Sequence, residues 1–167
     1  GNLKRTITKR SLSIILTIIM LLDVFAIISN ASIYNPTPVD EYYYTVFNGE
    51  ATIIGYRQSE KKVTIPSKLG GYPVTGIGCF AFDNNNTIET VSIPNSVTHI
   101  DEGAFSGCKK LKSVIIPNSV RTVGKEAFGG CVSLTSITFS KNMDTIDVET
   151  FESCYALKSV TIPGTIK

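Results

Sequence analysis

IPNSVTHIDEGAFSGCKKLKSV, residues 93–114, decides the fold, because its pattern returns at a fixed interval along the chain. The interval is 23 residues. It separates each neighbouring pair among four phenylalanines, Phe82, Phe105, Phe128 and Phe151. Other apolar columns keep the same phase, among them Ile77, Ile100, Val123 and Ile146, and then Val91, Val114, Ile137 and Val160. Units this short bury their apolar faces by stacking on one another, so the spacing predicts a solenoid in which the four phenylalanines are buried in one file.

Each unit contains signals for two extended segments and one turn. Residues 111–116 are rich in β-branched side chains and stop at Pro117, which predicts a short strand. Residues 120–123 predict a second extended segment, and residues 125–130, which end in two glycines, predict a single helical turn. The expected fold is therefore a β-rich stack of short parallel strands.

The first coil is preceded by a hairpin signal. Two β-prone runs, 42–45 and 51–56, flank Asn48-Gly49, a dipeptide typical of two-residue hairpin turns. We expect this hairpin to cover the open apolar end of the first coil, as terminal caps do in solenoids. The first unit also carries about five extra residues, 70–74, whose Gly-Gly and Tyr-Pro steps predict a surface loop.

The repeat resembles the BspA-type leucine-rich repeats of surface and secreted proteins. The matching residues are Ile93-Pro94-Asn95-Ser96-Val97, Ala104-Phe105 and Cys108 to Leu111, together with Gly71-Tyr72-Pro73-Val74 in the first unit. The resemblance implies a right-handed leucine-rich repeat stack and an exported module that acts by binding, with adhesion as its role. Ser140, Lys141 and Thr150 depart from the pattern, which we interpret as decay of the last full repeat.

The N-terminal segment has the outline of a secretion signal. Lys4, Arg5, Lys9 and Arg10 precede the apolar run 12–22, and small residues at 29–31 predict cleavage after Ala31. An uncleaved membrane anchor and a buried core helix are the alternatives, although Asp23 would be costly for an anchor within a bilayer. The predicted organisation is a signal at 1–31, a linker at 32–40, a hairpin cap at 41–62 and repeats at 63–167, in a secreted or cell-surface protein.

The net charge of the chain comes from this N-terminal segment. Residues 1–31 hold four of the 16 basic and one of the 14 acidic residues, so the remainder has 12 basic and 13 acidic residues. No basic stripe with interleaved aromatic residues lies on the repeats, and the composition argues against nucleic-acid binding. We expect contact with membranes through the signal segment alone.

The cysteines invite a redox or metal interpretation. Cys108, Cys131 and Cys154 share one repeat position, and Asn85 occupies that position in the first unit. Neighbouring coils lie about 4.8 Å apart, so a disulfide between them is conceivable. Buried free thiols are favoured, and a straight file cannot surround a metal tetrahedrally. Cys79 lies in another phase and is expected to be exposed.

The sequence offers little for catalysis. His99 is the single histidine, and it stands at a repeat position otherwise held by Gly76, Thr122 and Thr145. No nucleophile elbow, phosphate-binding glycine loop or recurring pair of carboxylates accompanies it. We therefore expect no enzyme, no catalytic residue, no metal site and no cofactor.

Strand alternation about the inward Val114 and Ile116 predicts an outward face rich in hydroxyl groups. Its partner would be an extracellular protein or glycan, although serine and threonine also simply suit exposed strands. A scaffold or spacer domain of an envelope protein, or an accessory domain of a secreted enzyme, are alternative roles. No cap is visible after Pro163, so we expect either further repeats or end-to-end self-association. The candidate binding face comprises Thr90, Ser92, Ser113, Ile115, Ser136, Thr138, Ser159 and Thr161.

Overall fold

The computed structural model describes residues 31–32, 41–147, 149–162 and 164. The chain forms two compact units, residues 1–32 and residues 33–167. In the first unit the described part is β1 (Ala31–Ser32). The predicted signal (1–31) and linker (32–40) therefore lie outside the described residues, apart from Ala31 and Ser32. Within the described ranges, no helix is long and apolar enough to cross a bilayer.

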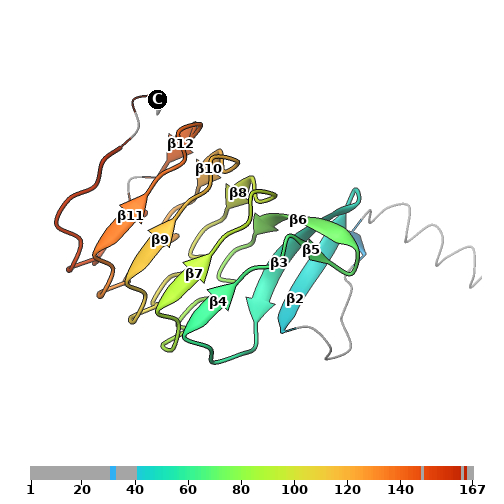
Figure 1. The fold of residues 1–167 in the computed structure, drawn as a ribbon, viewed down its shortest axis with the longest axis horizontal. Coiled ribbons are helices and arrows are strands. Elements are labelled where there is room, and N and C mark those ends of the chain that lie inside the picture. Colours follow the sequence, from blue (N-terminus) through green and yellow to red (C-terminus); the bar gives the residue numbers. More distant parts are fainter. Residues whose placement is uncertain (1–30, 33–40, 148, 163, 165–167) are drawn as a thin grey trace, which may run out of the picture. The chain divides into compact units, whose positions relative to one another are not determined.

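The second unit is a stack of coils whose strands form two sheets (Figure 1). The first, here called the hydroxyl sheet, is parallel throughout. Its strands, in chain order, are β4 (Lys62–Thr64), β7 (Thr90–Ser92), β9 (Ser113–Ile115) and β11 (Ser136–Thr138).

The second, here called the hairpin sheet, begins with the antiparallel pair β2 and β3 and continues with parallel strands. The short strand β5 (Lys68–Leu69) pairs antiparallel with β6 at the loop predicted from Gly70-Gly71. The strands of the hairpin sheet are β2 (Tyr42–Phe47), β3 (Glu50–Tyr56), β6 (Tyr72–Ile77), β8 (His99–Ile100), β10 (Thr122–Val123) and β12 (Thr145–Ile146).

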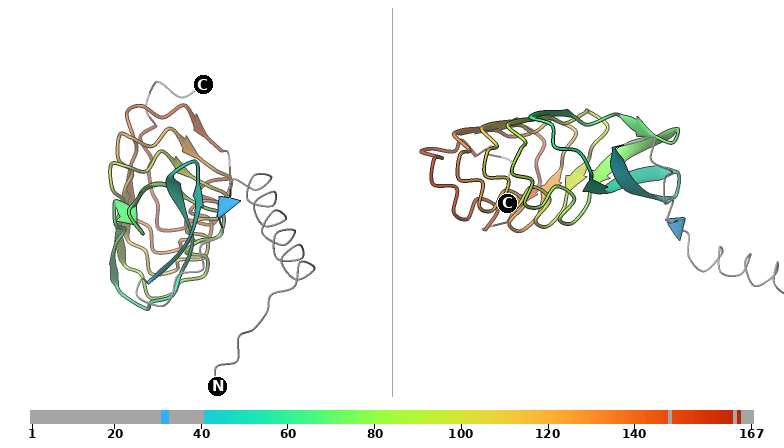
Figure 2. Two further views of the ribbon diagram at one scale, coloured as in Figure 1. Left: turned by 90° about the vertical axis from the view of Figure 1, so that its right-hand side faces the viewer. Right: turned by 90° about the horizontal axis from the view of Figure 1, so that it is seen from below.

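The pairing register reproduces the sequence period. Val91 pairs with Val114, and Val114 pairs with Ile137, so equivalent residues of neighbouring coils lie side by side. The views in Figure 2 show the coils enclosing a common interior between the two sheets. The predicted 23-residue solenoid is confirmed.

Phenylalanine rings fill that interior in one file. Phe82, Phe105 and Phe128 are almost completely buried, and their rings stack with centroids 4.8 and 5.3 Å apart. Phe151 continues the file at 5.9 Å from Phe128, but it is only partly buried. The expectation that all four are buried is thus wrong for Phe151, because this residue lies in the last described full coil and has a neighbouring phenylalanine of the file on one side only.

The predicted helical turn is not formed, and the described residues contain no helix. Backbone N–H groups alternate instead: that of Ala127 donates to the Gly124 carbonyl in its own coil, whereas that of Phe128 donates to Thr150 in the next coil. A helix would send both donors along its own axis. Positive φ angles at Glu126 and Gly130, 52° and 68°, also take the backbone out of the right-handed helical region. We call residues 78–85, 101–108, 124–131 and 149–154 the turn ladder.

The hairpin turns at Asn48-Gly49, whose φ angles of 49° and 79° suit a two-residue turn. Its strand β3 pairs with β6, the first strand of the repeats in this sheet. Ala51 and Ile53 from β3 are fully buried, and the Tyr42 hydroxyl donates to the Thr64 carbonyl at 3.2 Å. Burial raises the pKa of Tyr42 above its usual range. The hairpin thus contributes both backbone pairing and side chains to the core.

Candidate binding face

The outward side chains of the hydroxyl sheet form two straight rows. One row runs from Lys62 through Thr90 and Ser113 to Ser136. The other runs from Thr64 through Ser92 and Ile115 to Thr138. Six of the eight predicted face residues therefore share this sheet. Ser159 and Thr161 are exposed, but they lie in a segment that is not assigned to a strand.

A shallow groove of about 590 Å³ follows these rows across three coils. Thr90, Ser113, Ser92, Ile115 and Thr138 line it, and the edges of inward residues form its floor. A second groove of about 380 Å³ shares Thr138 and Lys141 with the first and reaches Thr161. Six of the eight predicted face residues thus line one of these two grooves, whereas Ser136 and Ser159 line neither.

Sequence reasoning missed a third row that borders the groove. It consists of Asn95, Asn118 and Lys141, which follow Pro94, Pro117 and Ser140 at one repeat position. The signal was available, because these residues recur every 23 positions directly after the strand. Amide and ammonium groups at this corner add hydrogen-bond donors to the hydroxyl rows.

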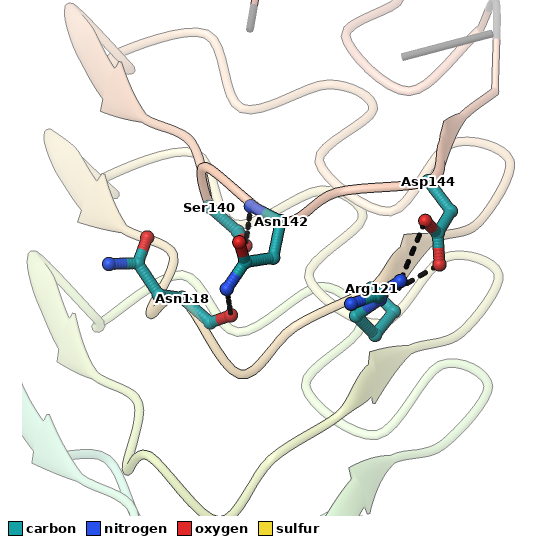
Figure 3. Close-up of polar contacts among 5 residues, drawn as sticks. All are labelled: Asn118, Arg121, Ser140, Asn142 and Asp144. Atoms are coloured by element: carbon teal, nitrogen blue, oxygen red, sulfur yellow. Dashed lines mark hydrogen bonds and ion pairs between the residues drawn. The ribbon is translucent and has the colours of Figure 1, made fainter. Parts of the chain in front are cut away.

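The corner after β11 shows how the chain tolerates the loss of a proline (Figure 3). Asn142 donates through its side-chain amide to the Asn118 carbonyl at 3.0 Å, and its backbone N–H donates to Ser140 Oγ at 3.1 Å. The Asn118 amide oxygen accepts a bond from the Lys141 N–H at 2.9 Å. Side-chain hydrogen bonds therefore hold this corner where the other coils have proline.

Ile115 differs from the rest of the two rows. Its side chain is 69% exposed, between Ser92 and Thr138 on the neighbouring strands. A buried aliphatic side chain contributes about 1.5–3 kcal/mol relative to an exposed one, and Ile115 gains little of this within the chain. It offers an apolar contact in the middle of a hydrogen-bonding surface.

Charged groups lie at the start of the strands. The Glu89 carboxylate lies 2.7 Å from the Lys112 ammonium and 3.4 Å from that of Lys61. The hydrogen bond from Lys112 lowers the pKa of Glu89. This glutamate stays ionised across the physiological range and links three coils.

The cysteine file is buried as free thiols. The thiols of Cys108, Cys131 and Cys154 donate to the carbonyls of Phe82, Phe105 and Phe128 at 3.1–3.2 Å. Burial raises the pKa of Cys108 to about 12 and shifts the pKa values of Cys131 and Cys154 in the same direction. Cys79 is exposed.

Other polar groups lie on the hairpin sheet and in the turn ladder. His99 lies within 3.1 Å of Thr98 Oγ1, and its ring packs against Gly76 of the preceding coil. The carboxylates of Glu126, Glu149 and Glu152 lie within 4.8 Å of one another, but the Lys125 ammonium contacts Glu149 at 2.8 Å. A pocket of about 300 Å³ lies between Asp101 and Asp147, at Gly124.

Comparison with known proteins agrees with the geometry. A leucine-rich repeat protein from T. pallidum has 32% sequence identity and a TM-score of 0.75, over 80% of this chain and 63% of its own. A leucine-rich cell surface protein from Faecalibacterium prausnitzii A2-165 has 28% identity and a TM-score of 0.58, over 81% of this chain and 45% of its own. The chain thus spans less than two thirds of either relative. No curated protein sequence matches it.

The sequence profile of the BspA type leucine-rich repeat region, in six copies, matches residues 56–167. This range begins at the end of β3 and covers every coil described above. Together with the 23-residue register and the similar solved structures, it identifies the chain as a member of the BspA-type leucine-rich repeat family.

Proposed function

We propose that this protein is exported and acts by binding an extracellular protein or glycan through the hydroxyl sheet, with adhesion as its role. The observation that carries the proposal is the groove of about 590 Å³ along five of the predicted face residues. The similarity to a protein described as a leucine-rich cell surface protein supports the location. The rows present hydroxyl groups at the spacing of stacked coils, which suits many weak hydrogen bonds to an extended ligand.

Export in this proposal depends on the N-terminal segment. The basic start, the apolar run 12–22 and the small residues at 29–31 stand in the order of a cleavable signal. Mass spectrometry of the secreted protein should give an N-terminus at Ser32. An intact N-terminus in the membrane fraction would support the anchor instead.

The binding role is tested by blocking the groove without changing charge. The full chain is screened against glycan and extracellular-matrix arrays next to a Ser92→Tyr, Thr138→Tyr variant, whose two rings would fill the exposed second row. Thr122→Tyr with Thr145→Tyr is the matched control, because these exposed threonines lie on the hairpin sheet. Loss of array binding in the first variant alone is expected.

A scaffold role is the second candidate, favoured by the continuity of the core from the hairpin to the last coil. It predicts that the array screen finds no ligand, while the two tyrosine variants behave alike. Binding that survives in the groove-blocked variant would contradict the use of the hydroxyl sheet.

A further inference from the structure

Each coil has two parts that differ in net charge. The part next to the hydroxyl sheet is here called the hydroxyl arc, and the part next to the hairpin sheet and the turns is called the acidic arc. The segments 85–96, 108–119 and 131–142, which carry β7, β9 and β11, and the equivalent segment 154–162 of the next unit contain five lysines and one glutamate, a net charge of +4. The segments that carry the hairpin sheet and the turn ladder, 97–107, 120–130 and 143–153, contain two bases and seven acids, a net charge of −5. The near-zero net charge of the repeats conceals this separation.

The ion pairs show which of these charges have partners within the chain. On the acidic arc both bases are paired, since Arg121 contacts Asp144 at 2.8 Å and Lys125 contacts Glu149 at 2.8 Å. On the hydroxyl arc Glu89 already contacts Lys61 and Lys112. Among the described residues, Lys62, Lys109 and Lys158 make no ion pair. The positive charge of these three lysines therefore faces solvent.

Lys62 and Lys141 lie near opposite ends of the outward rows. Lys62 begins the first outward row, in register with Thr90 on the neighbouring strand. Lys141 lines the groove at its other end, beyond Thr138. Between them the rows carry hydroxyl groups and the exposed Ile115, with no charge. A ligand that lies along the groove meets Lys141 at one end and Ile115 at the centre, and beyond Thr90 at the other end it reaches the strand that carries Lys62.

We infer that the groove takes an acidic, extended segment of another protein, with an apolar side chain seated on Ile115. Negative charge on the ligand complements the lysines, which raises the association rate and selects against basic partners. Ile115 favours a polypeptide over an acidic polysaccharide, since sugars typically stack on exposed aromatic rings, and the aromatic residue of the groove, Phe139, is 7% exposed. This inference rests on the proposed binding role of the hydroxyl sheet.

The test uses two fluorescent twelve-residue peptides on the full chain. One alternates glutamate with leucine and threonine, and the other has glutamine in place of each glutamate. At low ionic strength, anisotropy titration should show at least tenfold tighter binding of the glutamate peptide, and this difference should shrink in 0.5 M salt.

Two variants locate the site. Lys62→Gln with Lys141→Gln should weaken the glutamate peptide at least threefold. Arg121→Gln with Lys125→Gln removes the same two positive charges from the acidic arc, so the glutamate peptide should bind it within twofold of the unchanged chain. Equal weakening by both pairs would show a non-specific charge effect and overturn the inference.

The remaining outcomes separate this inference from the proposed function. If the glutamine peptide binds equally well and the Ser92→Tyr, Thr138→Tyr variant abolishes binding, the sheet binds proteins without a preference for acids, and only the inference fails. Tighter binding of hyaluronate than of the glutamate peptide would also overturn it, in favour of an acidic glycan. Salt-sensitive self-association in the absence of peptide would identify the acidic arc of a second copy as the occupant, and would overturn it as well.

Discussion

Phe128 contributes to the stability of the stack by packing against rings from two neighbouring coils. Its ring is fully buried and lies between those of Phe105 and Phe151, at nearly parallel angles of 3° and 9°. Because each ring of the file belongs to a different coil, removing one opens space that neither neighbour can fill by itself. The same sequence column that reveals the repeat thus also holds the coils together.

Replacement of this ring gives the first prediction. Phe128→Ala should lower the free energy of unfolding by about 3–5 kcal/mol, measured by urea denaturation with a circular-dichroism signal. Phe47→Ala is the control, since Phe47 is 54% exposed at the end of β2. A loss no larger than that of the control would contradict a core shared between coils.

The cysteine file gives a second prediction, on reactivity and pH. In the folded chain at pH 8, Cys79 should react with a thiol reagent, whereas the three buried thiols should react only after denaturation. Their raised pKa values keep them neutral in the folded state while the unfolded thiols ionise near pH 9. Their contribution to stability is therefore complete below about pH 8.5 and falls as the pH rises towards 12.

Tyrosine and lysine also titrate at high pH, so the comparison needs a variant. The difference in unfolding free energy between pH 7 and pH 10.5 should be smaller in Cys131→Ala than in the unchanged chain. Identical pH dependence in the two proteins would show that Cys131 ionises normally when folded.

At the scale of elements, the strands and the hairpin were predictable and the turn was not. A proline after a β-branched run marks where β4, β7 and β9 stop, whereas β11 has Ser140 at that position, and Asn48-Gly49 marks the hairpin. The segment 125–130 has the composition of a helical turn, but its alternate N–H groups bond to the next coil. Local composition cannot reveal a partner 22 residues away, so the competing hydrogen bonds decide the turn.

The same limit applies to the candidate face. Alternation within a strand predicted which side chains point outward for the six face residues that lie on the hydroxyl sheet, because side-chain direction is a local property. The corner residues Asn95, Asn118 and Lys141 lie after the strand, where direction depends on how the chain bends. Their recurrence in the sequence was visible, but their position at the groove required the fold.

The turn ladder yields a third prediction. Gly107 has a φ of +66°, and its N–H donates to the Gly129 carbonyl of the next coil at 2.7 Å. Gly107→Ala should cost about 1–2 kcal/mol, because a side chain disfavours this backbone conformation and an added Cβ would press on Asn84. Gly71→Ala is the control: its φ is +88° and no atom lies within 4 Å of an added Cβ. Thermal unfolding should show the larger loss for Gly107→Ala, and the reverse order would contradict the constraint from the next coil.

At the scale of the whole molecule, contacts run between neighbouring coils, so stability depends on how each end is covered. The hairpin packs Ala51 and Ile53 on the first coil. At the other end, Leu157 and Val160 are partly buried and Ile162 is 58% exposed. The T. pallidum and Faecalibacterium prausnitzii proteins named above both extend beyond the part that matches this chain. The two ends therefore differ in how much apolar surface they leave open to a further coil or a second molecule.

The last prediction concerns this C-terminal edge. We expect the full chain to self-associate through it, because Ile162 is exposed there and exposed apolar side chains favour association. Light scattering over a concentration series should show the association, and Ile162→Glu should reduce it. Fusing a designed coil after Lys167, copied from residues 122–144 so that the 23-residue register continues, should raise the melting temperature and also reduce association. If the chain is a monomer and neither change affects it, the last coil is already closed. An unchanged melting temperature after the fusion would also mean that stability does not grow with the number of coils, as nearest-neighbour stacking requires.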